Sequence, residues 1–278
     1  MTFNFKKAIA QASNDLTNPA LFAIILGQSG SGKSTVCGTL NEKSLYLYFS
    51  GESHGARNAN AITKGEITPL CVDMDGEKQL GPDETYARLL EILSSSEIAK
   101  EGFKGIILDG FPELESIMVR TKKFRQDCLS DKGKHNSFAE SRVVIGMYKP
   151  VLELLQAYHR KGIHILTTCK LDVRDMDEEG GISESAPRLM TYSVAEDLVS
   201  KFDDVLAIGK MTRVIEGVTH TKHKFQFLAG VRKVSKDMAT GTVKKILNFS
   251  PRLSGVLGEK LPEITDADLQ KIITIKKG

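Results

Sequence analysis

The stretch Leu21-Phe-Ala-Ile-Ile-Leu26 runs directly into Gly27-Gln-Ser-Gly-Ser-Gly-Lys33-Ser34. The apolar run indicates a buried strand, and the segment after it matches the pattern GxxxxGK[ST] completely. Glycines at these positions let backbone N–H groups surround an anion, and the helix expected from about Lys33 to Asn41 points the positive end of its dipole at that anion. We therefore predict a phosphate-binding loop with these members: Gly27, Gln28, Ser29, Gly30, Ser31, Gly32, Lys33, Ser34 and Thr35.

A magnesium-nucleotide site needs a metal-holding acid besides this loop. In such sites the loop lysine, here Lys33, reaches the β and γ phosphates, and the hydroxyl of Ser34 is a ligand of Mg²⁺. The apolar strand Gly105–Asp109 ends in a carboxylate, which is suited to hold Mg²⁺ through water. We therefore expect ATP and Mg²⁺ as cofactors, with Ser34 and Asp109 as the metal-binding residues.

Hydrolysis also requires a group that orients and activates water. The residue after Asp109 is Gly110, so a glutamate does not follow this strand directly. The strand Leu45–Phe49, however, continues into Ser50-Gly51-Glu52, and we expect it to lie beside the strand of the phosphate loop. Glu52 is therefore the predicted catalytic carboxylate, with an exposed loop glutamate as the alternative.

The order of these features resembles the RecA-like recombinase core over about residues 20 to 245. The resemblance implies that Thr168, in the strand-end pair Thr167-Thr168, senses the γ-phosphate. It also implies that Lys233 or Lys236, in the segment Arg232 to Asp237, acts on the ATP of a neighbouring subunit as an arginine finger does. The segments GFPELES, PRL, FDDVLAI and RKVSKD resemble small phage ATPases, in particular the RecA-like branch of the Sak single-strand annealing proteins.

Alternating strand and helix patterns predict an α/β fold with a mainly parallel central sheet, helices on both faces and an antiparallel extension at the C-terminal edge. We expect a core over residues 20–250, an N-terminal segment 1–19 and a C-terminal tail 251–278 with a loosely attached helix from Asp266 to Ile275. Residues 51–82 are expected to be irregular, and Lys170–Pro187 a long acidic loop. Phe5-Lys-Lys-Ala8 resembles a recombinase subunit clasp, although a hydrophobic staple explains it equally well.

The charge of the chain is strongly patterned, although its formal net charge is only +3. Residues 118–149 hold eight Lys and Arg against three Asp and Glu, whereas residues 171–186 hold one Arg against six acids. Such segregation favours a polyanionic partner. The N-terminus has no hydrophobic signal core, so we expect a cytoplasmic protein without a membrane partner, in the host cytoplasm if it is phage-encoded.

The resemblance implies binding of single-stranded DNA, self-association into a ring or filament, and a single-strand binding protein or helicase as a possible partner. In RecA-like cores, two loops at the filament axis touch DNA, here about Ser130 to Arg142 and Lys170 to Leu189. The candidate DNA-binding residues in and beside them are Arg125, Lys132, Lys134, Arg142, Arg174 and Arg188.

Two other functions remain open at this level. One is a nucleotide-gated helicase loader or an assembly or packaging accessory, whose partner is a protein; the acidic segment 171–186 favours it because it would repel a DNA backbone. The other is a small-molecule kinase, which is disfavoured because no lid with clustered arginines is evident. DNA binding at two salt concentrations separates the first from the annealing hypothesis.

Overall fold

The computed structural model describes residues 18–130, 133–176, 182–215, 218–227, 232–236, 243–247, 263–264 and 267–277. Six parallel strands form its centre in the order β9-β1-β7-β6-β2-β3. Their bounds are β9 Asp204–Ile215, β1 Phe22–Gly27, β7 His164–Met176, β6 Gly105–Asp109, β2 Ser44–Tyr48 and β3 Ile67–Cys71. At one edge, β10 (Val218–Phe227) and β13 (Glu263–Ile264) add to β9 in antiparallel pairing. The predicted parallel sheet and its antiparallel extension are confirmed.

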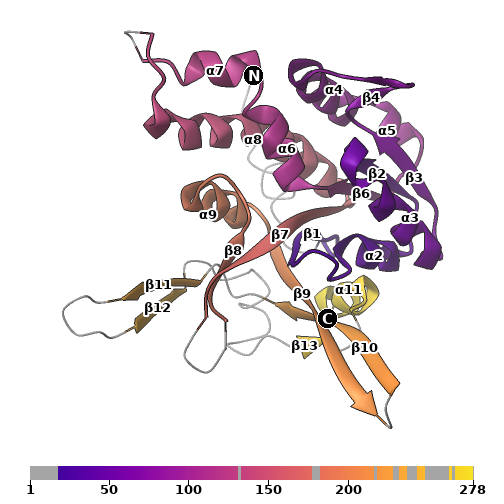
Figure 1. The fold of residues 1–278 in the computed structure, drawn as a ribbon. Helices are drawn as coiled ribbons and strands as arrows, with labels where there is room; N and C mark the ends of the chain where they lie inside the picture. The colour runs from indigo at the N-terminus through magenta and orange to yellow at the C-terminus, as the bar shows by residue number, and fades with distance from the viewer. Residues whose placement is uncertain are drawn as a thin grey trace, which may run out of the picture.

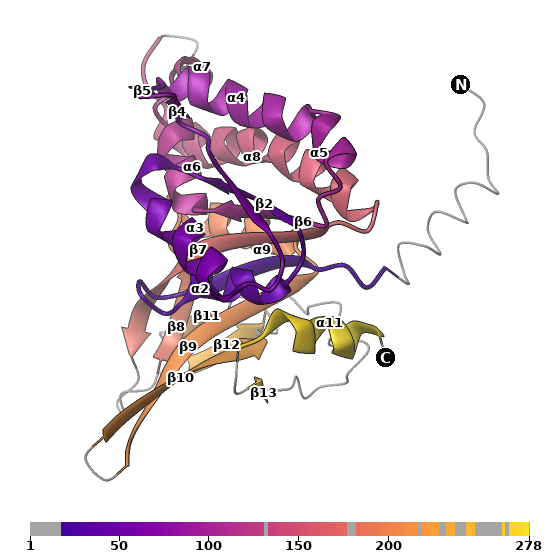
Figure 2. The ribbon, with the colours of Figure 1, turned by 90° about the vertical axis from the view of Figure 1, so that its right-hand side faces the viewer.

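Helices cover both faces of this sheet (Figure 1). The larger layer contains α4 (Pro82–Ser94), α6 (Phe111–Met118), α7 (Lys122–Asp127), α8 (Ser137–His159) and α9 (Tyr192–Ser200). The other face carries α2 (Lys33–Cys37), η1 (Gly38–Leu40), α3 (Ser53–Ile62) and α11 (Leu269–Lys277). Figure 2 shows α4, α6 and α8 on one side of the strands and α11 on the other.

The two-residue period of β1 explains why both faces are covered. Phe22, Ile24 and Leu26 pack into the core on the α6 and α8 side, whereas Ala23 and Ile25 pack against α2 and α11. Because successive strand side chains point to opposite faces, a strand that is apolar throughout must be buried on both. The arrangement is an α/β core with a mainly parallel central sheet and helices on both faces.

Further short elements connect these layers and extend them. They are η2 (Ser50–Glu52), β4 (Met74–Asp75), β5 (Lys78–Gln79), α5 (Glu97–Lys100), β8 (Ile182–Pro187), β11 (Arg232–Lys236) and β12 (Val243–Leu247). Strands β4 and β5 form one small antiparallel pair, and β11 and β12 form another. The segment after β6 is helical in two pieces, α6 and α7.

Four sequence-based expectations are wrong, and the fourth concerns the C-terminal helix. Residues 51–82 contain α3 and the edge strand β3 rather than irregular structure, because α3 packs through small residues and not through a large apolar face. A Cβ on Gly38 would lie 2.2 Å from the carbonyl oxygen of Ala59. Lys170–Pro187 is largely an antiparallel hairpin of β7 and β8 rather than a long loop. Finally, β2 lies beside β6 and β3, not beside β1.

The C-terminal helix is also not loosely attached. The side chains of Leu269 and Ile272 are completely buried beside Val36 and Leu40. The Leu269 N–H donates to the Thr39 hydroxyl over 2.9 Å, and Lys276 Nζ lies 2.9 Å from the buried Asp204 Oδ2. This helix therefore forms part of the core behind the phosphate loop.

Candidate nucleotide site

The predicted phosphate loop connects β1 to α2. Gly30 and Gly32 adopt φ values of 71° and 94°, a left-handed conformation that glycine enters without the cost of a Cβ. The Lys33 ammonium group donates to the carbonyl oxygens of Gly27 and Gln28 over 2.9 and 3.0 Å. Burial lowers the pKa of Lys33. A partly desolvated cation in a glycine-rich loop between a strand and a helix is suited to an anionic ligand.

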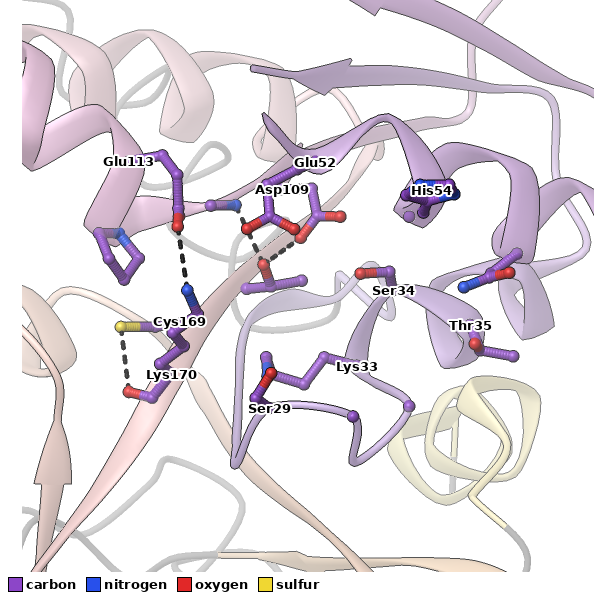
Figure 3. Close-up of a pocket in the computed structure, with 17 residues that line it drawn as sticks. Ser29, Lys33, Ser34, Thr35, Glu52, His54, Asp109, Glu113, Cys169 and Lys170 are labelled. Carbon is purple, nitrogen blue, oxygen red and sulfur yellow. Dashed lines mark hydrogen bonds and ion pairs between the residues drawn. The ribbon is translucent and has the colours of Figure 1, made fainter. Parts of the chain in front are cut away.

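This loop forms one side of a cavity of about 270 Å³ (Figure 3). From the loop, the cavity is lined by Ser29, Gly30, Gly32, Lys33, Ser34 and Thr35. From the rest of the chain, it is lined by Glu52, His54, Gly55, Asn58, Asp109, Gly110, Pro112, Glu113, Thr168, Cys169 and Lys170. The structure therefore brings the predicted residues Lys33, Ser34, Glu52, Asp109 and Thr168 together. Three loop members do not line the cavity: Gly27 ends β1, Gln28 is exposed and Ser31 is buried.

Asp109 is held rigidly at the end of β6, and its side chain is only 3% exposed. The hydroxyl of Tyr46, on β2, donates to Oδ2, and the hydroxyl of Thr168, on β7, donates to Oδ1. Gly55 lies so close that a Cβ there would be 2.3 Å from Asp109 Oδ2. This fixed carboxylate and the Ser34 hydroxyl, which line the same cavity, are oxygen donors of the kind that Mg²⁺ takes together with water and phosphate.

The hydroxyl of Thr168 has two hydrogen bonds. Besides donating to Asp109, it accepts the N–H of Gly110 over 3.1 Å. Thr168 therefore orients Asp109 and the turn into α6. Its predicted contact with a γ-phosphate stays a prediction.

Glu52 faces the cavity from η2, the turn after β2. Asp73 fixes this turn, because its two carboxylate oxygens accept the N–H and the hydroxyl of Ser50, each over 2.7 Å. Burial raises the pKa of Glu52, and the nearby carboxylates of Glu113 and Asp109 raise it further. A carboxylate with a raised pKa is a stronger proton acceptor, as a general base requires.

The sequence reasoning missed Tyr46, Glu113 and Lys170. The side chain of Tyr46 points to the α2 face of the sheet, where its hydroxyl reaches Asp109. Because side chains alternate between the two faces of a strand, this shared face was the signal that the sequence offered. Glu113 lies four residues after Asp109, in the first turn of α6, and Lys170 follows the pair Thr168-Cys169 on β7. Their meeting depends on the neighbouring positions of β6 and β7 in the sheet.

Comparisons with known proteins assign neither a family nor a function to the chain. No family model matches the chain, and no curated protein matches it. Among solved structures, a KaiC-like protein of the hyperthermophilic archaeon Pyrococcus horikoshii OT3 is similar at 12% sequence identity and a TM-score of 0.39. The match covers 81% of this chain and 84% of the archaeal one. Functional conclusions therefore rest on the cavity itself.

Among the residues that the structure describes, the other predicted side chains do not line the cavity. Arg125, Lys134, Arg142 and Arg188 are exposed. Lys132, Phe5 and Ala8 lie outside the described residues, as do the side chains of Arg174, Lys233 and Lys236. The roles predicted for all of them stay predictions. No helix within the described ranges is long and apolar enough to cross a membrane.

Proposed function

We propose that this protein is a Mg²⁺-dependent ATPase of phage DNA recombination or replication that binds single-stranded DNA and promotes strand annealing. The observation that carries the proposal is the meeting, in one cavity, of Lys33 with the strand-end carboxylates Asp109 and Glu52. A phosphate-binding loop, a metal-holding acid and a water-orienting acid are the parts that ATP hydrolysis requires. We expect slow turnover without DNA or a partner, because Lys233 or Lys236 of a neighbouring subunit completes the site.

In this proposal each residue has one task. Lys33 neutralises the β and γ phosphates, and Glu52 orients water and accepts its proton. Ser34 and Asp109 would hold Mg²⁺, which neutralises phosphate charge when bound. Tyr46 and Thr168 keep the Asp109 carboxylate in place, so that little reorganisation is needed when nucleotide arrives.

The test of the nucleotide proposal is Lys33→Ala. We expect it to weaken ATP binding by about 100-fold or more, because one desolvated charge-assisted contact to each of two phosphates is lost. Calorimetric titration with Mg²⁺ and a non-hydrolysable ATP analogue measures this loss. Lys149→Ala, at an exposed lysine of α8, is the matched control. Full ATP hydrolysis by Lys33→Ala would contradict the assignment.

Support for the DNA part comes from the start of α8. Phe138 is 96% exposed at the first turn of this helix, with its N–H held by the Asn136 side chain. The exposed cations Lys134 and Arg142 lie four residues to either side of it in sequence. An exposed aromatic ring among cations is suited to single-stranded DNA, because bases stack on the ring while the cations meet phosphates.

The annealing hypothesis is tested by binding of a fluorescent single-stranded oligonucleotide at two salt concentrations. Phe138→Ala is expected to weaken binding about 5- to 100-fold, the range for loss of one stacked base. Arg142→Ala is expected to weaken binding and to reduce its salt dependence. Ile62→Ala removes an apolar side chain that is 43% exposed on α3, and it should leave binding unchanged.

A protein-partner function is the second candidate, supported by the acidic composition of residues 171–186. These residues fall mainly on the β7–β8 hairpin. Absence of DNA binding at low salt, together with intact ATP binding, would favour a helicase loader or packaging accessory over an annealing protein.

A further inference from the structure

Two charged side chains of the cavity have no task in the proposal above. Lys170 Nζ lies 3.2 Å from Glu113 Oε1, and the two side chains are 36% and 25% exposed. Both side chains line the cavity that also contains Lys33 and Glu52. Figure 3 shows this ion pair on the side of the cavity that faces the phosphate loop. A half-buried ion pair inside a binding cavity is available to exchange partners with a charged ligand.

The backbone of Lys170 is fixed beside the phosphate loop. In the pairing of β1 with β7, Lys170 stands opposite Gly27, the first residue of the loop. On its other side, the Lys170 carbonyl oxygen accepts the N–H of Arg188 over 2.7 Å. Because the backbone is paired on both sides, the flexible four-carbon side chain is the part that can move.

The charges of the cavity give that movement a direction. Three carboxylates line it, on Glu52, Asp109 and Glu113, and among its lining residues the ammonium groups are those of Lys33 and Lys170. Glu113 and Asp109 already raise the pKa of Glu52, so negative charge is crowded on this side. The γ-phosphate of a bound triphosphate would add further negative charge near these acids. Lys170 is the lining cation on the same side as the acids, so it can neutralise that charge.

We propose that Lys170 is a γ-phosphate ligand and that Glu113 is its resting partner. On binding of a nucleoside triphosphate, the Lys170 ammonium exchanges the Glu113 carboxylate for the terminal phosphate. With a diphosphate, Lys170 stays paired with Glu113. The pair therefore sets the preference of the site for triphosphate over diphosphate. This inference rests on the proposed nucleotide function and adds a specificity-determining pair to it.

The two partners are expected to act in opposite directions. Lys170→Met keeps an unbranched side chain, one heavy atom shorter, and removes the charge. It should therefore weaken binding of a non-hydrolysable ATP analogue about 10- to 100-fold and leave ADP binding within about twofold. Glu113→Gln removes the competitor, so it should tighten analogue binding several-fold without a change for ADP. In the double variant the tightening should disappear, since it acts through Lys170.

The experiment is calorimetric titration of the full chain with ADP and with the analogue, both with Mg²⁺. The matched control pair is Lys149→Met and Glu153→Gln, which removes an exposed ion pair of 3.9 Å on α8. Misfolding lowers affinity, so it cannot account for the tighter binding of the analogue that is expected for Glu113→Gln. Equal losses for ADP and analogue in Lys170→Met, or an unchanged ratio of the two affinities in both variants, would overturn the inference.

Failure of the underlying function has a different result. If the wild-type chain binds neither nucleotide, or if Lys33→Ala binds both as the wild type does, the nucleotide proposal and the inference fall together. If the wild type binds both nucleotides through Lys33 while Lys170→Met keeps the wild-type preference, only the inference falls.

Discussion

The two sides of the nucleotide cavity are built in different ways. The loop side is one contiguous segment, whose backbone and Lys33 supply the contacts. The opposite wall contains Glu52, Asp109, Glu113 and Lys170. These residues come from η2, the end of β6, the start of α6 and the middle of β7. In the proposed function, the phosphate contacts of Lys33 are therefore local to one segment of the chain, whereas hydrolysis and triphosphate discrimination depend on how the sheet is assembled.

The largest effect that separates the two sides is expected for Glu52→Gln. Loss of a general base lowers kcat by about 100- to 10,000-fold, while nucleotide affinity should be kept or slightly improved, because one of three crowded carboxylates is removed. Steady-state hydrolysis and calorimetric titration of the same preparation measure both quantities. Glu77→Gln, at an exposed position of the β4–β5 turn, is the control.

A loss of affinity in Glu52→Gln comparable to the loss of hydrolysis would break the comparison, because Glu52 would then contribute to nucleotide binding as much as to hydrolysis. Unchanged hydrolysis would remove Glu52 from the catalytic role and leave Glu113 as the carboxylate to test.

A smaller effect is expected where the two sides meet, at Gly55. A Cβ there would lie 2.3 Å from Asp109 Oδ2 and 3.0 Å from Ser34 Cβ, so Gly55→Ala should displace the acid and the loop serine together. We expect a loss of about 3 kcal/mol in unfolding free energy, as for an overpacked core, and a higher Mg²⁺ requirement. Urea unfolding and a Mg²⁺ titration of nucleotide binding measure these two quantities.

The matched control for Gly55→Ala is Gly146→Ala on α8, where an added Cβ would contact nothing within 4 Å. Replacement of a mid-helix glycine by alanine should stabilise the protein by about 0.5–1 kcal/mol. Equal unfolding free energies for the Gly55→Ala variant and the wild type would show that the two sides are not in rigid contact.

The smallest effect concerns Glu115, on the buried face of α6 behind the assembled wall. Burial raises the pKa of Glu115 to about 7 from an ordinary value of 4.5. One of its carboxylate oxygens accepts the Met190 N–H over 2.7 Å, and the other is buried without a hydrogen-bond partner among the described residues. The folded state therefore favours the protonated acid.

Because the pKa is raised on folding, the stability from Glu115 is fully present below about pH 4.5 and is lost as the pH rises through about 7. Glu115→Gln keeps the hydrogen-bond acceptor for the Met190 N–H and does not ionise. Its unfolding free energy relative to the wild type should therefore increase by about 2 kcal/mol from pH 5 to pH 8.5. Urea unfolding at the two pH values measures this gain, with the exposed Glu91→Gln as control. A constant difference between variant and wild type would contradict the expected ionisation.

Features that depend on residues close together in sequence were predicted, and features that depend on contacts between distant residues were missed. The phosphate loop, the buried strands and the strand-end acid at Asp109 were predicted because periodicity and turn chemistry are local. Helix α3 was missed because its buried positions, Gly55, Ala56 and Ala59, are small residues that form no large apolar stripe. The docking of α11 was missed because Leu269 and Ile272 show no partner until the chain folds.

The sequence by itself determined that a chain segment able to surround phosphate follows a buried strand, because backbone geometry at glycine and one lysine suffices for that. Only the tertiary structure decided which acids face this segment. The placement of β7 between β1 and β6 brings Lys170 opposite Gly27 and within an ion-pair distance of Glu113. Sheet order is set by packing over the whole core, so residues far apart in sequence become neighbours only after that packing is complete.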